Sequence, residues 1–130
     1  MICFEHDYNP CTMLFRGILL VFALISSAAW GEDLHRIRAA AERGDPGAQY
    51  DLGTIYQEGV LVRSDLAEAR RLWRKAADQG HSEAQLNLGI AYARGDGVPL
   101  DRERSRKWLT LSASQGYGPA QRLLKELDQH

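Results

Sequence analysis

The sequence predicts an all-α protein: an α/α right-handed solenoid of antiparallel helix pairs, with about two full repeats and a half-repeat cap at each end. The first supporting observation is a fixed period, because four positions keep their residue at steps of 36. They are Gly44, Gly80 and Gly116; Ala48, Ala84 and Ala120; Gln49, Gln85 and Gln121; and Leu52, Leu88 and Leu124. The second is that each full period contains two apolar stripes at helical spacing, and the third is that glycine follows each of these stripes. Such a period is typical of stacked units that cannot bury their apolar faces alone.

The first repeat, residues 45–80, is predicted to form two helices joined by a loop. Asp45 before Pro46 is typical of an N-cap followed by proline at the first helical position. The apolar stripe of this helix consists of Ala48, Leu52, Ile55 and Tyr56, and Gly59 ends it. Asp65 with Glu68 forms the D-x-x-E signal that starts the second helix. The stripe of the second helix consists of Leu66, Ala69, Leu72, Trp73, Ala76 and Ala77.

The second repeat, residues 81–116, has the same pattern. His81 or Ser82 starts a helix with the stripe Ala84, Leu88, Ala91 and Tyr92. Asp101 caps a second helix with the stripe Ser105, Trp108, Leu109 and Ser112. Two further pairs recur at the same step, Gly53 with Gly89 and Tyr56 with Tyr92. Because a mid-helix glycine costs about 1 kcal/mol relative to alanine, its recurrence predicts close helix crossings at these two positions.

Half-repeats are expected at both ends of a repeat domain that spans residues 32–130. Residues 117–128 give one more helix of the first type, in which Lys125 and Asp128 replace the recurring glycine and tyrosine. Polar residues at these stacking positions are typical of a terminating cap. Residues 32–43 give a single helix of the second type, which we expect to cover the open face of the first repeat.

The segment 13–29 is predicted to be a signal peptide. A short apolar run, 17–25, follows Arg16 and precedes small residues, with cleavage expected after Ala29 or, as the less favoured choice, after Gly31. The run is shorter than the roughly 20 residues that span a bilayer, so we expect no stable membrane insertion after cleavage. Acidic residues in 1–12 do not fit a signal peptide, and we interpret 1–12 as a mis-called start. The product is expected to be exported, periplasmic or secreted. A buried helix over 14–29 is the alternative.

The composition after this segment limits the classes of partner. Both cysteines, Cys3 and Cys11, precede the apolar run, so the mature chain has no disulfide and depends on core packing. Residues 30–130 contain 15 Lys and Arg against 15 Asp and Glu. This balance does not favour nucleic acid or a membrane surface as a partner.

The repeats resemble a known family, the Sel-one-like repeats (SLR), which are related to the tetratricopeptide repeat. The resemblance depends on the strings AAERGDPGAQYDLGTIYQEG, AEARRLWRKAADQG, EAQLNLGIAYARGDGVPLD and SRKWLTLSASQG. It runs through 40–116 and, in part, on to Leu127. The motifs A-Q-x-x-L-G-x-x-Y, G-x-G-V-P and W-x-x-x-A-A fall in register, although Leu61 and Arg63 depart from the family's loop. The resemblance implies a helical solenoid that binds other proteins.

No arrangement of residues predicts catalysis, a metal or a cofactor. His35, His81 and His130 are separated by a repeat or more, and neither H-E-x-x-H nor G-x-S-x-G occurs. The loop Gly95-Asp96-Gly97-Val98 follows a helix and lacks the flanking lysine of a phosphate loop. We therefore expect a protein that is not an enzyme.

The favoured function is an exported adaptor or scaffold for protein–protein interaction. The first helices of each repeat are expected to line the inner face of the stack, where their polar side chains would meet a partner. These side chains are Gln49, Thr54 and Gln57; Gln85, Asn87 and Arg94; and Gln121 and Arg122. The recurring glutamines have a second interpretation, which we favour slightly, in which their amides hold the helix pair together internally.

Three alternatives remain open. Basic clusters on the second helices form either a solvated outer face or an anion-binding stripe; they are Arg70, Arg71, Arg74 and Lys75, and Arg102, Arg104, Arg106 and Lys107. Some cysteine-rich exported members of the family that the repeats resemble are described as binding or cleaving β-lactams. The resemblance therefore leaves hydrolysis of the β-lactamase type as an alternative, which a nitrocefin turnover assay would detect. End-to-end self-association through the truncated third repeat would appear in sedimentation across a concentration series.

Overall fold

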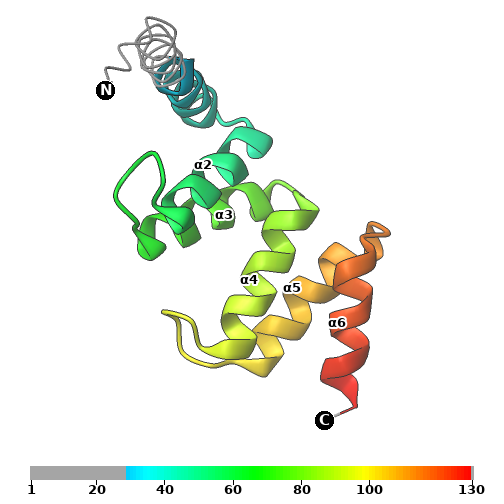
Figure 1. Cartoon of the computed structure of the whole chain (residues 1–130). Coiled ribbons are helices and arrows are strands. Elements are labelled where there is room, and N and C mark those ends of the chain that lie inside the picture. Colours follow the sequence, from blue (N-terminus) through cyan, green and yellow to red (C-terminus); the bar gives the residue numbers. More distant parts are fainter. Residues whose placement is uncertain (1–28, 130) are drawn as a thin grey trace, which may run out of the picture. The chain divides into compact units, whose positions relative to one another are not determined.

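The computed structural model describes residues 29–129 of the chain. One helix occupies residues 29–42. It is followed by α2 (Pro46–Glu58), α3 (Leu66–Asp78), α4 (Ser82–Arg94), α5 (Arg102–Ser114) and α6 (Gly118–Asp128) (Figure 1). Within the described residues there is no strand. The predicted signal segment up to residue 28, the proposed start at Met13 and both cysteines lie outside this range. The fold below is that of the compact unit that begins at Leu34.

Consecutive helices pack against one another, which confirms the prediction of an all-α solenoid. The two helices of each repeat form the pairs α2–α3 and α4–α5, and the pairs are joined through contacts of α3 with α4 and of α5 with α6. The larger hydrophobic cluster spans both repeats, with Trp73 and Ala77 from α3, Leu88 and Tyr92 from α4, and Trp108 from α5. A single apolar interior therefore continues from one repeat into the next.

The helices begin where the capping residues predict. The side chains of Asp45, Asp65 and Asp101 accept hydrogen bonds from backbone N–H groups three residues later, at 2.9, 3.0 and 2.9 Å. His81 takes the same role at α4, where its Nδ1 accepts from the N–H of Ala84 at 3.4 Å. Each of these bonds satisfies a donor that the first turn of a helix leaves unpaired.

The capping box expected from Asp65 and Glu68 at the start of α3 is only half formed. The carboxylate of Glu68 does not return to the backbone of Asp65, whose N–H instead donates to the carbonyl of Tyr56 at 3.0 Å. Glu68 pairs with Arg71, with 2.7 Å between Nε and Oε2. The loop that closes α2 onto α3 has already used the donor that a reciprocal capping box requires.

Close crossings occur at both recurring mid-helix glycines, as predicted. A Cβ built on Gly53 would lie 2.6 Å from Nε1 of Trp73, and one on Gly89 would lie 2.8 Å from Cδ2 of Leu109. The indole N–H of Trp73 is buried against α2 and has no hydrogen-bond partner within the described chain. The glycines therefore let α2 and α4 approach the large apolar residue that the following helix presents.

The predicted apolar stripes are mostly correct. Ala69, Leu72, Trp73, Ala76 and Ala77 are buried on α3, but Leu66 at its start is 49% exposed. That expectation was wrong because Leu66 lies in the first turn of α3, beyond the point where α2 covers it. The four stripe positions of α5, Ser105, Trp108, Leu109 and Ser112, are all buried.

Candidate partner-binding grooves

The two helices of a repeat differ in how much surface they expose. On α4 only Arg94 is exposed, whereas α5 exposes charged side chains along its length, among them Arg102, Arg106 and Lys107. In the second repeat α4 is therefore the more enclosed helix and α5 the more exposed one. We call the first helices, α2, α4 and α6, the inner layer and the second helices, α3 and α5, the outer layer. A partner that contacts the inner layer meets half-buried side chains, which are already held in place by packing.

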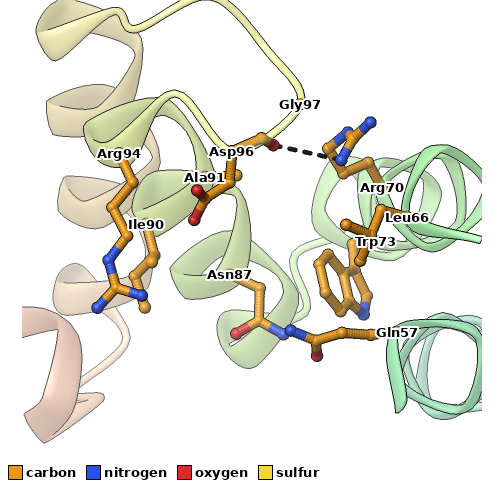
Figure 2. A pocket seen from close by; sticks show the side chains of 10 residues that line it. All are labelled: Gln57, Leu66, Arg70, Trp73, Asn87, Ile90, Ala91, Arg94, Asp96 and Gly97. Atoms are coloured by element: carbon orange, nitrogen blue, oxygen red, sulfur yellow. Dashed lines mark hydrogen bonds between the residues drawn. The ribbon is translucent and has the colours of Figure 1, made fainter. Parts of the chain in front are cut away.

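A groove of about 400 Å³ lies where α2, α3 and α4 meet (Figure 2). Gln57 reaches it from the end of α2, Trp73 from α3, and Asn87 from α4. Figure 2 shows the amide ends of Gln57 and Asn87 directed toward each other across the opening. We call this groove, defined by Gln57, Trp73 and Asn87, the amide hollow.

A hydrogen bond between the two repeats closes one side of the amide hollow. Nη1 of Arg70, on α3, donates to the backbone carbonyl of Asp96 at 3.2 Å, in the loop after α4 (Figure 2). Gly97 next to it has φ of +67°, a conformation that glycine adopts without strain, and a Cβ there would displace the Arg70 guanidinium. The loop and α3 are thus held together at this edge.

A second groove, of about 300 Å³, lies among α4, α5 and α6. Its apolar lining comes from Ala93, Leu109, Leu123 and Leu127, and charged side chains of Arg102 and Glu126 lie at its margin. We call this groove, defined by those four apolar residues, the aliphatic hollow. Ile90 and Arg94 of α4 line both hollows.

Arg94 is the charged residue that the two hollows share. It is exposed at the end of α4, and no ion pair or hydrogen bond of its side chain occurs within the described residues. Some other arginines of the domain are paired, as Arg71 is with Glu68 and Arg106 with Asp128 at 2.9 Å. Arg94 can therefore receive a carboxylate without giving up an existing partner.

Two of the glutamines predicted to contact a partner lie inside the fold. Gln49 and Gln85 are 4% and 3% exposed. Nε2 of Gln49 donates to the carbonyl of Ala41 at 3.2 Å, and Nε2 of Gln85 donates to the carbonyl of Ala77 at 3.1 Å. Their placement on the partner surface was wrong, because a buried amide must find its partners internally. Their second interpretation, as internal ties, agrees with this geometry.

Of the other residues predicted to contact a partner, Gln57 and Arg94 line a hollow, whereas Gln121 and Arg122 do not. Gln57 and Arg94 line the amide hollow together. Gln121 is exposed on α6, yet it donates to the carbonyl of Ala113 at 3.3 Å, as Gln85 and Gln49 do to the equivalent carbonyls one and two repeats earlier. Arg122 is exposed on α6 and lines neither hollow.

Four of the eight residues in the basic clusters on the outer layer form ion pairs, Arg71, Arg74, Arg104 and Arg106. Arg71 and Arg74 on α3 pair with Glu68 and Asp78, and Arg104 on α5 pairs with Asp101. Arg74 also lies over the ring of Trp108, 5.0 Å from its centroid. These contacts favour a solvated outer face over an anion-binding stripe, since exposed and paired cations attract little further charge.

Three described side chains have shifted pKa values, Tyr50, Glu68 and Arg71. The hydrogen bond to Glu68 raises the pKa of Arg71 above its usual value. The hydrogen bond from Arg71 lowers the pKa of Glu68 below its usual value, although burial opposes this. Burial raises the pKa of Tyr50, and the charge of Glu83 adds to the effect. The Tyr50 ring stacks on His81 with 4.8 Å between centroids, so it fastens α2 to the start of α4. None of these shifts belongs to an arrangement with a nucleophile and a base.

Among the described residues, no group of three or more His, Cys, Asp or Glu side chains is placed to hold a metal ion. In the same part of the chain, no helix has the length and apolar character to cross a membrane.

Sequence reasoning missed the apolar half of the candidate site. Trp73 was expected on the apolar stripe of the second helix, and neither Leu123 nor Leu127 was predicted to contact a partner, yet all three line hollows. The period could have shown this, because Leu109 and Leu123 are the counterparts of Trp73 and Asn87 36 residues later.

Comparisons with known proteins follow the same repeats. The family model for the Sel1 repeat matches residues 46–81 and 82–117. A Sel1 repeat protein from Oxalobacter formigenes is 46% identical over 70% of this chain, with a TM-score of 0.67. The protein c5321, a protective antigen present in uropathogenic Escherichia coli strains that displays an SLR fold, is 36% identical over 70% of this chain, also with a TM-score of 0.67. The matches cover 26% and 20% of those two chains. No curated protein matches.

Proposed function

Because the chain belongs to the Sel1 repeat family, whose repeats mediate protein–protein interaction, we propose that it is an exported adaptor that binds a linear segment of a partner protein. The segment lies across α2, α4 and α6, in the amide hollow and the aliphatic hollow. The observation that carries this proposal is the position of Arg94, an unpaired cation between two preformed grooves. Grooves of this kind suit an extended chain, which fills successive hollows with alternate side chains.

Affinity capture tests the binding face. The full chain with a C-terminal affinity tag is produced in its native cells, and proteins held by it are recovered from the envelope fraction. We expect Arg94→Glu to abolish recovery of the partner, because the new carboxylate repels the acid that Arg94 would bind. Lys107→Glu is the matched control, since Lys107 is an exposed cation on the outer layer. Recovery that survives Arg94→Glu and fails with Lys107→Glu would refute this face.

Export is tested separately by cell fractionation and N-terminal sequencing. The proposal expects the mature protein in the periplasm or the medium, beginning at Trp30 or, with the less favoured cleavage, at Glu32. A cytoplasmic product that still begins at Met1 or Met13 would contradict export. That result would leave the binding face untouched, because the two hollows involve only residues after 56.

A further inference from the structure

The two hollows occupy the same place in successive repeats but differ in chemistry. Three positions that line the amide hollow are occupied by Gln57, Trp73 and Asn87. The positions 36 residues later, which line the aliphatic hollow, are Ala93, Leu109 and Leu123. Two primary amides are thus replaced by alanine and leucine, while the backbone around them is repeated. The stack offers one polar and one apolar compartment in a fixed order.

The amide hollow suits the polar atoms of a peptide. A primary amide carries both a donor and an acceptor, so Gln57 and Asn87 can bond a backbone amide or a polar side chain from two sides. Asn87 is half-buried and lies beside the Tyr50 hydroxyl, which limits its rotation. A group held in this way loses little entropy when a ligand binds.

The aliphatic hollow suits a branched apolar side chain. Leu109 is 2% exposed and forms the floor, and Leu123 and Leu127 on α6 are half-buried. Entry of a leucine-sized side chain would remove these surfaces from water, which favours binding by the hydrophobic effect. Glu126 and Arg102 at its margin leave the interior of this hollow apolar.

We infer that the ligand is an extended acidic–aliphatic segment, with its carboxylate on Arg94, an aliphatic residue in the aliphatic hollow and a polar residue in the amide hollow. This inference rests on the proposed function. The two hollows lie on either side of α4, whose Ile90 and Arg94 line both. A helix with its side chains is about 10–12 Å wide and an extended chain rises about 3.3 Å per residue, so about three residues separate the two hollows. The acidic residue therefore lies one or two positions from the aliphatic one, between it and the polar residue.

The probe is a display library of random linear peptides, selected on the purified full chain and on three variants. Arg94→Ala removes the cation. The exchange variant N87L/L123N puts leucine into the amide hollow and asparagine into the aliphatic hollow. Positions 87 and 123 are equivalent in the two repeats, so each residue already occurs at this place in the fold. Circular dichroism on heating shows which variants remain folded. Arg94→Ala keeps the test informative if the exchange variant unfolds, because Arg94 is exposed. Lys107→Ala is the control.

The wild type and Lys107→Ala are expected to enrich peptides with an acidic and an aliphatic residue at the stated spacing. Arg94→Ala should lower the affinity of such a peptide at least about tenfold and end the acidic preference. N87L/L123N should reverse the order of the polar and aliphatic residues. Enriched peptides without the acidic–aliphatic pair, or an order that the exchange leaves unchanged, would overturn the inference while leaving the proposed function in place. No enrichment over an empty support would overturn both.

Discussion

Nε2 of Gln79, at the C-terminal end of α3, donates to Oε1 of Gln49 on α2 at 2.8 Å, within the first repeat. Gln115 makes the same bond to Gln85 at 2.9 Å, 36 residues later. Each buried glutamine also donates to a backbone carbonyl eight residues earlier. The amide thus ties its own helix to the preceding helix and to the end of the following helix, and the repetition of these bonds explains why glutamine recurs with the period.

We expect Gln85→Ala to lower the free energy of unfolding by about 2 kcal/mol, because it removes two hydrogen bonds from a buried group. Gln121→Ala is the matched control. Gln121 is exposed and makes only the bond to Ala113, so its loss should cost less than about 1 kcal/mol. Urea denaturation of both variants measures the difference. Equal losses would show that the buried network adds nothing specific.

A side chain at Gly53 should force α2 away from α3. In Gly53→Ala the new Cβ meets Nε1 and Cδ1 of Trp73 at 2.6 and 2.7 Å, which predicts a loss of about 2 kcal/mol, and Gly53→Leu should lose more. Gly118→Ala adds the same methyl group in the first turn of α6, where nothing lies within 4 Å. Its thermal midpoint should stay the same or rise. A Gly53→Leu variant with native thermal stability would contradict the close crossing.

Asp101→Ala should destabilise the second helix pair by about 1 kcal/mol, since it removes the N-cap of α5. Asp101→Asn keeps an acceptor for the N–H of Arg104 and should lose less than half as much. Chemical denaturation of the two variants at high salt isolates the cap, because salt screens the ion pair of Asp101 with Arg104. Indistinguishable variants would mean that the cap does not stabilise α5.

The Glu68–Arg71 pair should make a small pH-dependent contribution. The pKa of Glu68 in the folded state lies below its usual value of 4.5. The stabilisation is therefore present above about pH 4.5 and is lost as the pH falls through the pKa of Glu68 in the folded protein. At pH 7 we expect Glu68→Gln to lose only a few tenths of a kcal/mol, because Arg71 is half exposed. Urea titrations at pH 7 and pH 3 measure the difference. A loss of the same size at both pH values would exclude the ion pair as its cause.

The period and the caps were sufficient to predict the helix pairs. Asp45, Asp65 and Asp101 begin helices because capping is local, and Gly53 marked a crossing because its cost within a helix requires a tertiary reason. Gln49 could not be placed from sequence, because a polar residue on an inner helix suits either solvent or a buried bond. Which one applies depends on the distance to Ala41, which is fixed by the turn between helices.

The hollows were also beyond local reasoning. Gln57 and Arg94 are polar residues at the ends of helices, and their types alone suggested exposure to a partner. Trp73 is a large apolar residue, and its type alone suggested burial in the core. Only the packed structure shows that its ring forms part of both the core and the wall of the amide hollow. Arg122 had the same local character as Arg94 and lies outside both hollows.

The most direct test is chemical-shift mapping of the ¹⁵N-labelled chain on addition of a library-selected peptide. The account predicts that the largest shifts fall on Asn87, Ile90 and Arg94 of α4 and on Leu123 of α6, while Lys107 and Thr110 on the outer layer do not shift. Shifts confined to the exposed side of α3 and α5 would contradict the central claim that partners bind in the hollows between successive first helices.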